Sequence, residues 1–143
     1  MPGRAIVVAS WVTVAIFAAG VIPDALGVRA LESVAVAVSL VFFLGSLPIW
    51  FYAYALGVTR TARGDDVTVS GLFFLSGSAP TDVRRHLLGA LAVCVVIVVG
   101  TAAENPFSVL VPMLPLGFAG LWGARHGTYP PRPAKKNPTG GRR

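Results

Sequence analysis

Four long apolar segments dominate this sequence of 143 residues and restrict the folds open to it. The segments cover residues 5–22, 33–56, 87–103 and 107–124, and none of them contains an acidic or a basic residue. At 1.5 Å per residue, a helix of 18 residues such as 5–22 is about 27 Å long, close to the roughly 30 Å hydrocarbon core of a bilayer. We therefore predict an all-α, polytopic membrane protein with four transmembrane helices.

The composition supports a membrane protein and argues against two other classes. Only 13% of the residues are charged, whereas a soluble domain carries about 25%. Strands of a membrane β-barrel alternate apolar and polar residues, and a run such as AVCVVIVVG (92–100) shows no alternation. The net charge of +6 does not indicate a nucleic-acid partner, because the basic residues lie between and after the apolar runs, not in a stripe with aromatic residues.

The basic residues predict the orientation. Arg29 is the only one of the twelve between spans one and two or between spans three and four, and the other eleven lie on the side of the two termini. Because basic loops stay in the cytoplasm, we predict a multi-pass protein of the cell inner (plasma) membrane with both termini cytoplasmic. Residues 1–127 then form the transmembrane domain with a cytoplasmic loop at 57–86, and the basic, Pro/Gly-rich tail 128–143 is expected to be disordered.

The first apolar segment also has features of a secretory signal peptide. Arg4 precedes it, and the small residues Ala18, Ala19 and Gly20 lie near its end. Eighteen uncharged residues are long for the apolar region of a signal peptide, and no clear cleavage motif follows. Retaining the segment also gives the consistent charge topology, so a first transmembrane helix is the favoured interpretation.

An apolar island interrupts the charged loop RGDDVTVSGLFFLSGSAPTDVRRH (63–86). It is too short to span a membrane and too apolar to lie in water. We predict that it lies in the inner headgroup boundary, or that it covers the inner mouth of the bundle. The interfacial residues of this connector are Leu72, Phe73, Phe74 and Leu75.

Small residues and prolines mark the packing surfaces. Span four carries a smooth ridge that consists of Gly117, Gly120 and Gly123. Another helix can approach this ridge closely, either from the same chain or from a partner subunit or second copy. Spans two and four contain prolines that predict kinks or irregular starts of these helices: Pro48, Pro112 and Pro115. A further interpretation is that a kinked helix lines a substrate cavity.

Cations at the predicted inner surface are candidates for binding lipid headgroups, at about 1 kcal/mol per charge. They are Arg84, Arg85, Arg125, Lys135 and Lys136. The tail that holds the two lysines has two further interpretations: it enforces orientation and solubility, or its PPRP sequence (130–133) binds a domain that recognises polyproline.

Residues that could carry out chemistry are sparse. No ionisable side chain lies in the middle of a span, which argues against proton-coupled transport by a single chain. The one cysteine, Cys94, has no partner for a disulfide, and no cluster has metal-ligand spacing or the arrangement of a catalytic triad. The sequence therefore predicts no catalytic residue, no cofactor and no metal.

The stretches DDVTVSGLFFLSGSAP, RRHLLGALAV and GLWGARHGTYPPR resemble small uncharacterised multi-span integral membrane proteins of actinobacteria. The likeness covers the loop and most of the second half of the chain, and the first half is similar only in hydropathy. The resemblance implies a location in the cell membrane and no particular activity.

Small size, uncharged spans and the glycine ridge favour a non-enzymatic accessory or assembly subunit of a cell-envelope or membrane complex. Its expected partners are the lipid bilayer and a membrane protein or a second copy of the chain. The alternative is a small oligomeric transporter in which the kinked spans two and four line the path.

Overall fold

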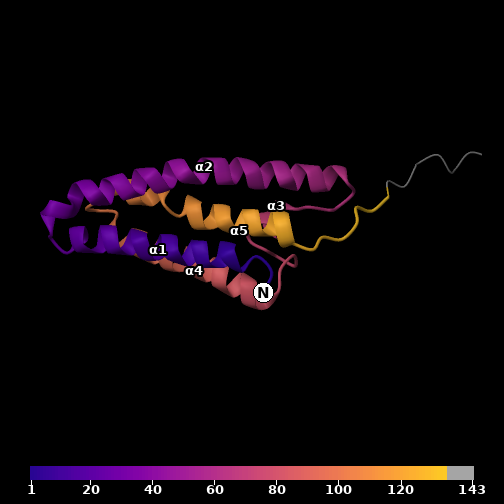
Figure 1. The fold of residues 1–143 in the computed structure, drawn as a ribbon, viewed down its shortest axis with the longest axis horizontal. Helices are drawn as coiled ribbons and strands as arrows, with labels where there is room; N and C mark the ends of the chain where they lie inside the picture. Colours follow the sequence, from indigo (N-terminus) through magenta and orange to yellow (C-terminus); the bar gives the residue numbers. More distant parts are fainter. Residues whose placement is uncertain (135–143) are drawn as a thin grey trace, which may run out of the picture.

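The computed structural model describes residues 1–134, which form an elongated bundle of helices (Figure 1). Four helices run along its length: α1 (Arg4–Ala25), α2 (Glu32–Ala62), α4 (Thr81–Thr101) and α5 (Met113–His126). Three short elements connect them: the 3₁₀ turns η1 (Arg29–Leu31) and η2 (Pro106–Leu110), and the short helix α3 (Val69–Phe73). The described part of the chain contains no β-strand, only an isolated bridge between Asp65 and Pro131.

Four helical segments of the described chain are long and apolar enough to cross a membrane, which confirms the predicted class. They are Arg4–Ala25, Arg29–Ala62, Thr81–Thr101 and Pro106–His126. The loop between the second and third is shorter than predicted, because α2 continues to Ala62 and α4 begins at Thr81. Pro80 immediately precedes α4 and Asp82 lies in its first turn, where a carboxylate is stabilised by the helix dipole.

Helix α5 lies at the centre of the bundle, between α2 and α1 in Figure 1. In the most apolar stretch of the span Pro106–His126, which contains α5, 56% of the residues are buried inside the protein, against 17% for the span that contains α2. Helix α5 packs against α1, α2, α3 and α4. Much of α2 is therefore left to contact the surroundings, and its outer surface carries exposed apolar side chains such as Val41, Leu44 and Phe51.

The antiparallel arrangement brings one end of each long helix to the same end of the bundle, which we call the α3 end (Figure 1). The start of α1, the end of α2, the start of α4 and the end of α5 all lie there, together with α3. The turns that contain Arg29 and Asn105 lie at the opposite end. The α3 end thus holds those basic residues within 1–134 from which we predict a cytoplasmic orientation.

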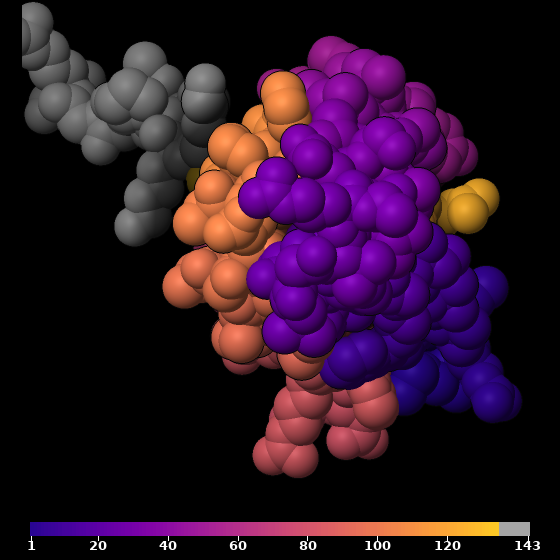
Figure 2. All heavy atoms as spheres, turned by 90° about the vertical axis from the view of Figure 1, so that its left-hand side faces the viewer, coloured from indigo at the N-terminus to yellow at the C-terminus, as the bar shows by residue number. Residues whose placement is uncertain are grey.

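The opposite end is closed by a buried polar contact between the α4–α5 connection and α2. Asn105 is 1% exposed, and its side-chain amide donates a hydrogen bond to the Ser39 hydroxyl on α2 (3.1 Å). Ser39 in turn donates to the carbonyl of Ala35 (2.8 Å). Figure 2 shows this end, with the connection from α4 to α5 (orange) packed against α2 (purple). The connection between α4 and α5 is therefore packed against α2.

The prolines of span four accompany an irregular start, which was one of the two predicted outcomes, and they do not kink a helix. Pro112 precedes the first residue of α5, and Pro115 lies in its first turn. The amide groups of a first turn have no partner within the helix, so proline is tolerated there. Pro48 differs, because it lies inside α2, which continues on both sides of it from Glu32 to Ala62.

Candidate functional site

The apolar island of the loop is buried inside the protein, which corrects its predicted place in the headgroup layer. Leu72, Phe73 and Leu75 are at most 5% exposed, whereas Phe74 is 48% exposed. The Thr68 side chain caps α3 by accepting a hydrogen bond from the Gly71 amide (3.0 Å). Three of the four island side chains therefore pack on the bundle, as in the alternative interpretation of a cover on its mouth, and only Phe74 is free to contact lipid.

The glycine ridge of α5 makes room for the island and for α2. A Cβ atom at Gly120 would collide with the Phe73 ring, and one at Gly123 would collide with the Leu72 carbonyl. A Cβ at Gly117 would lie 3.0 Å from the Trp50 ring on α2. The ridge is thus filled by side chains and backbone of the same chain, so a partner helix has no access to it.

The segment after α5 is folded against the loop, which corrects the disorder predicted for the tail as far as Arg132. The Asp66 amide donates to the Pro130 carbonyl (2.8 Å), and the Arg132 amide donates to the Gly64 carbonyl (2.8 Å). These backbone pairs fix residues 128–132 on the surface of the α3 end. Residues 135–143 of the tail, including the headgroup candidates Lys135 and Lys136, lie outside the described residues.

Arg60 and Tyr129 join this segment to α2 and α5. The Arg60 side chain donates to Asp65 (2.9 Å) and to the Ala124 carbonyl (3.3 Å), and its guanidinium lies 4.8 Å from the centre of the Tyr129 ring. The Tyr129 hydroxyl lies within hydrogen-bonding distance of the carbonyls of Gly71 (3.2 Å) and Gly123 (3.1 Å). Burial raises the pKa of Tyr129 above its ordinary value of 10.0, outweighing the opposite effect of Ser78 and Arg60.

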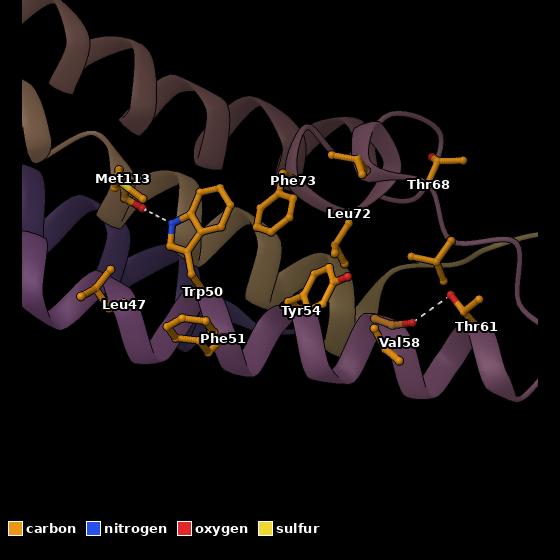
Figure 3. Close-up of a pocket in the computed structure, with 13 residues that line it drawn as sticks. Leu47, Trp50, Phe51, Tyr54, Val58, Thr61, Thr68, Leu72, Phe73 and Met113 are labelled. Carbon is orange, nitrogen blue, oxygen red and sulfur yellow. Dashed lines mark hydrogen bonds between the residues drawn. The ribbon is translucent and has the colours of Figure 1, made fainter.

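An apolar groove of about 690 Å³ opens between α2 and α3 (Figure 3). We call it the α2–α3 groove. One wall is a stripe on α2 and the other consists of residues 67–69, α3 and Met113. The stripe recurs every three or four residues, as expected for one helix face, and consists of Leu47, Trp50, Phe51, Tyr54, Val58 and Thr61.

Trp50 and Phe73 form the fixed base of the groove. The Trp50 indole donates to the Met113 carbonyl (2.7 Å) and stacks on the Phe73 ring, with 4.3 Å between centroids and 20° between planes. Beyond them Phe51 and Tyr54 are 73% and 63% exposed. The groove therefore combines a rigid aromatic base with aromatic side chains that have few contacts in this chain.

Three of the predicted headgroup cations, Arg84, Arg85 and Arg125, are described and lie at the α3 end. Arg84 and Arg85 are exposed in the first two turns of α4. Arg125 is exposed in the last turn of α5, and its guanidinium lies 5.9 Å from the centre of the Tyr52 ring. Among residues 1–134 no group of three His, Cys, Asp or Glu side chains could hold a metal ion.

The α2–α3 groove is missing from our sequence-based list of site residues. Its signal is present in the sequence, since Leu47, Phe51, Tyr54 and Val58 follow helical spacing on the most aromatic stretch of span two. The second wall carries no comparable signal, because α3 reaches it only by packing on glycines of α5. The roles of Arg60 and Tyr129 were also missed, because their contacts join residues that are far apart in the sequence.

No protein-family model, no curated protein and no solved structure matches the chain. The protein is assigned to a class by its fold alone: an all-α protein with four helices long and apolar enough to cross a membrane. The resemblance to actinobacterial membrane proteins stays a prediction, and the function is inferred from the geometry of this chain.

Proposed function

We propose that the protein is a non-enzymatic accessory or assembly subunit of a larger membrane or cell-envelope complex. In this proposal the α2–α3 groove holds a membrane-spanning helix of a partner protein. The groove is the observation that carries the proposal, because it places exposed aromatic residues on the span that this chain covers least. The glycine ridge does not support a partner, because it is filled by residues of the same chain.

The shape of the groove fits a helix. From Leu47 to Thr61 the stripe is about 21 Å long at 1.5 Å per residue, or about four helical turns. Membrane helices associate through close packing and hydrogen bonds, since lipid is as apolar as their side chains. A groove with two walls gives a helix more packing contacts than a flat face, and Tyr54 and Thr61 supply hydroxyl groups.

Aromatic residues favour a protein over bulk lipid as the occupant. Aromatic side chains are enriched in the cores of protein interfaces, and those that carry most binding energy lie in well-packed pockets. Trp50 and Phe73 are held rigidly by their stacking and by the bond to Met113, so a partner need not order them. Phe51 and Tyr54 then provide the exposed contacts.

Site-specific crosslinking in native membranes tests the proposal. A photoreactive amino acid in place of Phe51 is expected to give one discrete product, whose crosslinked peptide lies in an apolar stretch of about 20 residues in the partner. The same probe in place of Val99, which is 77% exposed on α4, serves as the control. Equal products at both positions, lipid adducts alone, or a product of two copies of this chain would contradict the proposal.

Substitutions in the stripe add a quantitative test. Changing Phe51 and Tyr54 to Ala together should lower recovery of the crosslinked partner about tenfold, the loss typical of interface anchors. Val99→Ala should leave recovery unchanged. Undiminished recovery from the double variant would show that the groove is not the docking surface.

We also propose that the α3 end faces the cytoplasm, which the charge pattern supports. A cysteine in place of Ser76, an exposed residue of the loop, should react with a membrane-impermeant maleimide only after the membrane is permeabilised. A cysteine in place of Ala30, exposed at the opposite end, should react in intact cells. The reverse pattern would invert the orientation.

A further inference from the structure

A second groove, of about 620 Å³, lies along the first half of α1 and reaches α4. We call it the α1 groove. Its apolar lining comes from one side of α1, with a single contribution from α4, and the lining residues are Met1, Arg4, Val7, Val8, Trp11, Val12, Ala15 and His86. This groove shares no lining residue with the α2–α3 groove.

The α1 groove has one basic end and one apolar end. Arg4 is the first residue of α1 and His86 lies in the second turn of α4, so both belong to the α3 end. From Arg4 to Ala15 the distance along α1 is about 16 Å, close to half of the roughly 30 Å hydrocarbon core. The groove therefore has the depth of one leaflet, with its basic end at the level of the headgroups.

Two contacts fix the shape of this groove. Trp11 lies beside α4, and a Cβ atom at Gly89 would be 3.7 Å from its indole ring. The turn before α1 is held by a hydrogen bond that the Trp122 indole donates to the Pro2 carbonyl (2.9 Å). Gly3 adopts a left-handed conformation (φ 67°) against that indole, which a residue with a side chain rarely adopts. Arg4 therefore starts from a fixed backbone position.

The charges at the basic end favour an anion. None of the eight lining residues is acidic. Arg4 is exposed. Among residues 1–134 the only ion pair joins Arg60 and Asp65, so Arg4 has no carboxylate partner. Asp82 lies one turn before His86 on α4 and offsets part of this charge, while the adjacent Arg84 and Arg85 add to it.

We propose that the α1 groove binds one phospholipid with an anionic headgroup. The Arg4 guanidinium forms paired hydrogen bonds with the phosphate, and the ring of His86 contacts the headgroup beside it. An acyl chain lies along Val8 and Val12, beside the Trp11 indole, which forms part of the same apolar wall. A lipid without net charge would bind the same apolar wall but would gain less from Arg4.

Lipid retention by the purified full-length chain tests this site. The protein is reconstituted in vesicles of phosphatidylglycerol and phosphatidylcholine in equal parts, extracted in mild detergent, and examined by native mass spectrometry. We expect the wild-type protein to retain phosphatidylglycerol selectively. Arg4→Gln should lower that selectivity about fivefold, the effect of one basic residue at a membrane surface.

Matched variants separate this site from general attraction to charge. Arg63→Gln removes an exposed arginine of the α3 end that does not line the groove, and it should leave the selectivity unchanged. Trp11→Ala should lower retention of both lipids by removing part of the wall. Equal retention of the two lipids by the wild-type protein, no effect of Arg4→Gln, or an equal effect of Arg63→Gln would overturn the proposal.

The two proposals fail separately. The lipid site is tested by the amount of phosphatidylglycerol that Arg4→Gln retains, and the proposed partner is tested by crosslinks at Phe51. Arg4 is exposed, so its substitution is expected to leave the fold intact, and an unchanged unfolding transition checks that point.

Discussion

Helices α2 and α5 pack side by side, yet they use different residues to do so. Helix α5 has 14 residues and presents glycines to its neighbours, so that α2 and the α3 segment approach its backbone closely. Helix α2 has 31 residues and presents large aromatic side chains. Some of these, such as Trp50, fill the space above the glycines of α5, and others, such as Phe51, point away from it.

This difference separates residues that maintain the fold from residues that are available for binding. The glycines of the ridge have close neighbours, so a side chain added there must disturb the bundle. Side chains on the exposed stripe of α2 have few neighbours, so changing them should affect binding more than stability. Matched substitutions on the two surfaces test the distinction.

The largest effect is expected for Phe73. Phe73→Ala should lower the free energy of unfolding by about 3 kcal/mol, at the low end for buried aromatics because the groove beside the ring lets its neighbours relax. Phe51→Ala removes the same group from an exposed position and should change the free energy of unfolding by less than about 0.5 kcal/mol. Unfolding in mixed micelles, followed by tryptophan fluorescence, measures both. Similar losses for the two variants would remove the distinction between core and stripe.

A smaller loss is expected when a side chain is added to the ridge. Gly120→Leu should lower the free energy of unfolding by about 2 kcal/mol, because the new side chain collides with the Phe73 ring. The matched variant Gly45→Leu on α2 meets nothing within 4 Å and should be neutral or slightly stabilising. The same unfolding experiment applies, and a neutral Gly120→Leu would mean that α3 is free to leave α5.

Arg60 should have a smaller effect that is confined to the α3 end. Arg60→Gln removes the ion pair with Asp65, the bond to Ala124 and the contact with Tyr129, and should cost about 1 kcal/mol. Amide hydrogen exchange should become faster at Asp66 and Arg132, whose amides pair the loop with the segment after α5. Arg63→Gln is the control, and unchanged exchange in Arg60→Gln would contradict the role of Arg60.

The smallest effect concerns pH. Because burial raises the pKa of Tyr129, the folded state retains the phenol proton more firmly than the unfolded state does. The stability from this group is therefore present below pH 10.0 and is lost as the pH rises through the folded-state pKa. The stability advantage of the wild-type protein over Tyr129→Phe should shrink above pH 10.0. A constant difference across this range would show that the phenol is not buried at the α3 end.

The sequence was sufficient to predict the four spans, because hydropathy and length are local properties. The start of α4 is likewise explained by local residues, because Pro80 and Asp82 favour a helix N-terminus regardless of the rest of the chain. An irregular start of span four was also predicted from Pro112 and Pro115. That Pro106–Leu110 forms a 3₁₀ turn was not, because a uniform apolar run does not distinguish such a turn from an α-helix.

The α3 end could not be predicted, because its contacts connect distant residues. The island is apolar enough for lipid, and only the fit of Phe73 over Gly120 places it inside the protein instead. The segment after α5 is polar and proline-rich, yet its backbone pairs with residues 64–66. Backbone hydrogen bonds depend little on side-chain identity, so composition alone could not reveal them.

The contact between Tyr129 and Gly71 also has a consequence for synthesis. The two residues are 58 positions apart, so at 5–20 residues per second the ribosome adds Tyr129 about 3 to 12 s after Gly71. The glycines of α5 that receive Phe73 and Leu72 are likewise made after the island. During this interval the nascent chain has an apolar loop without its final binding surface. Burial of the island is therefore completed only after α5 has been made.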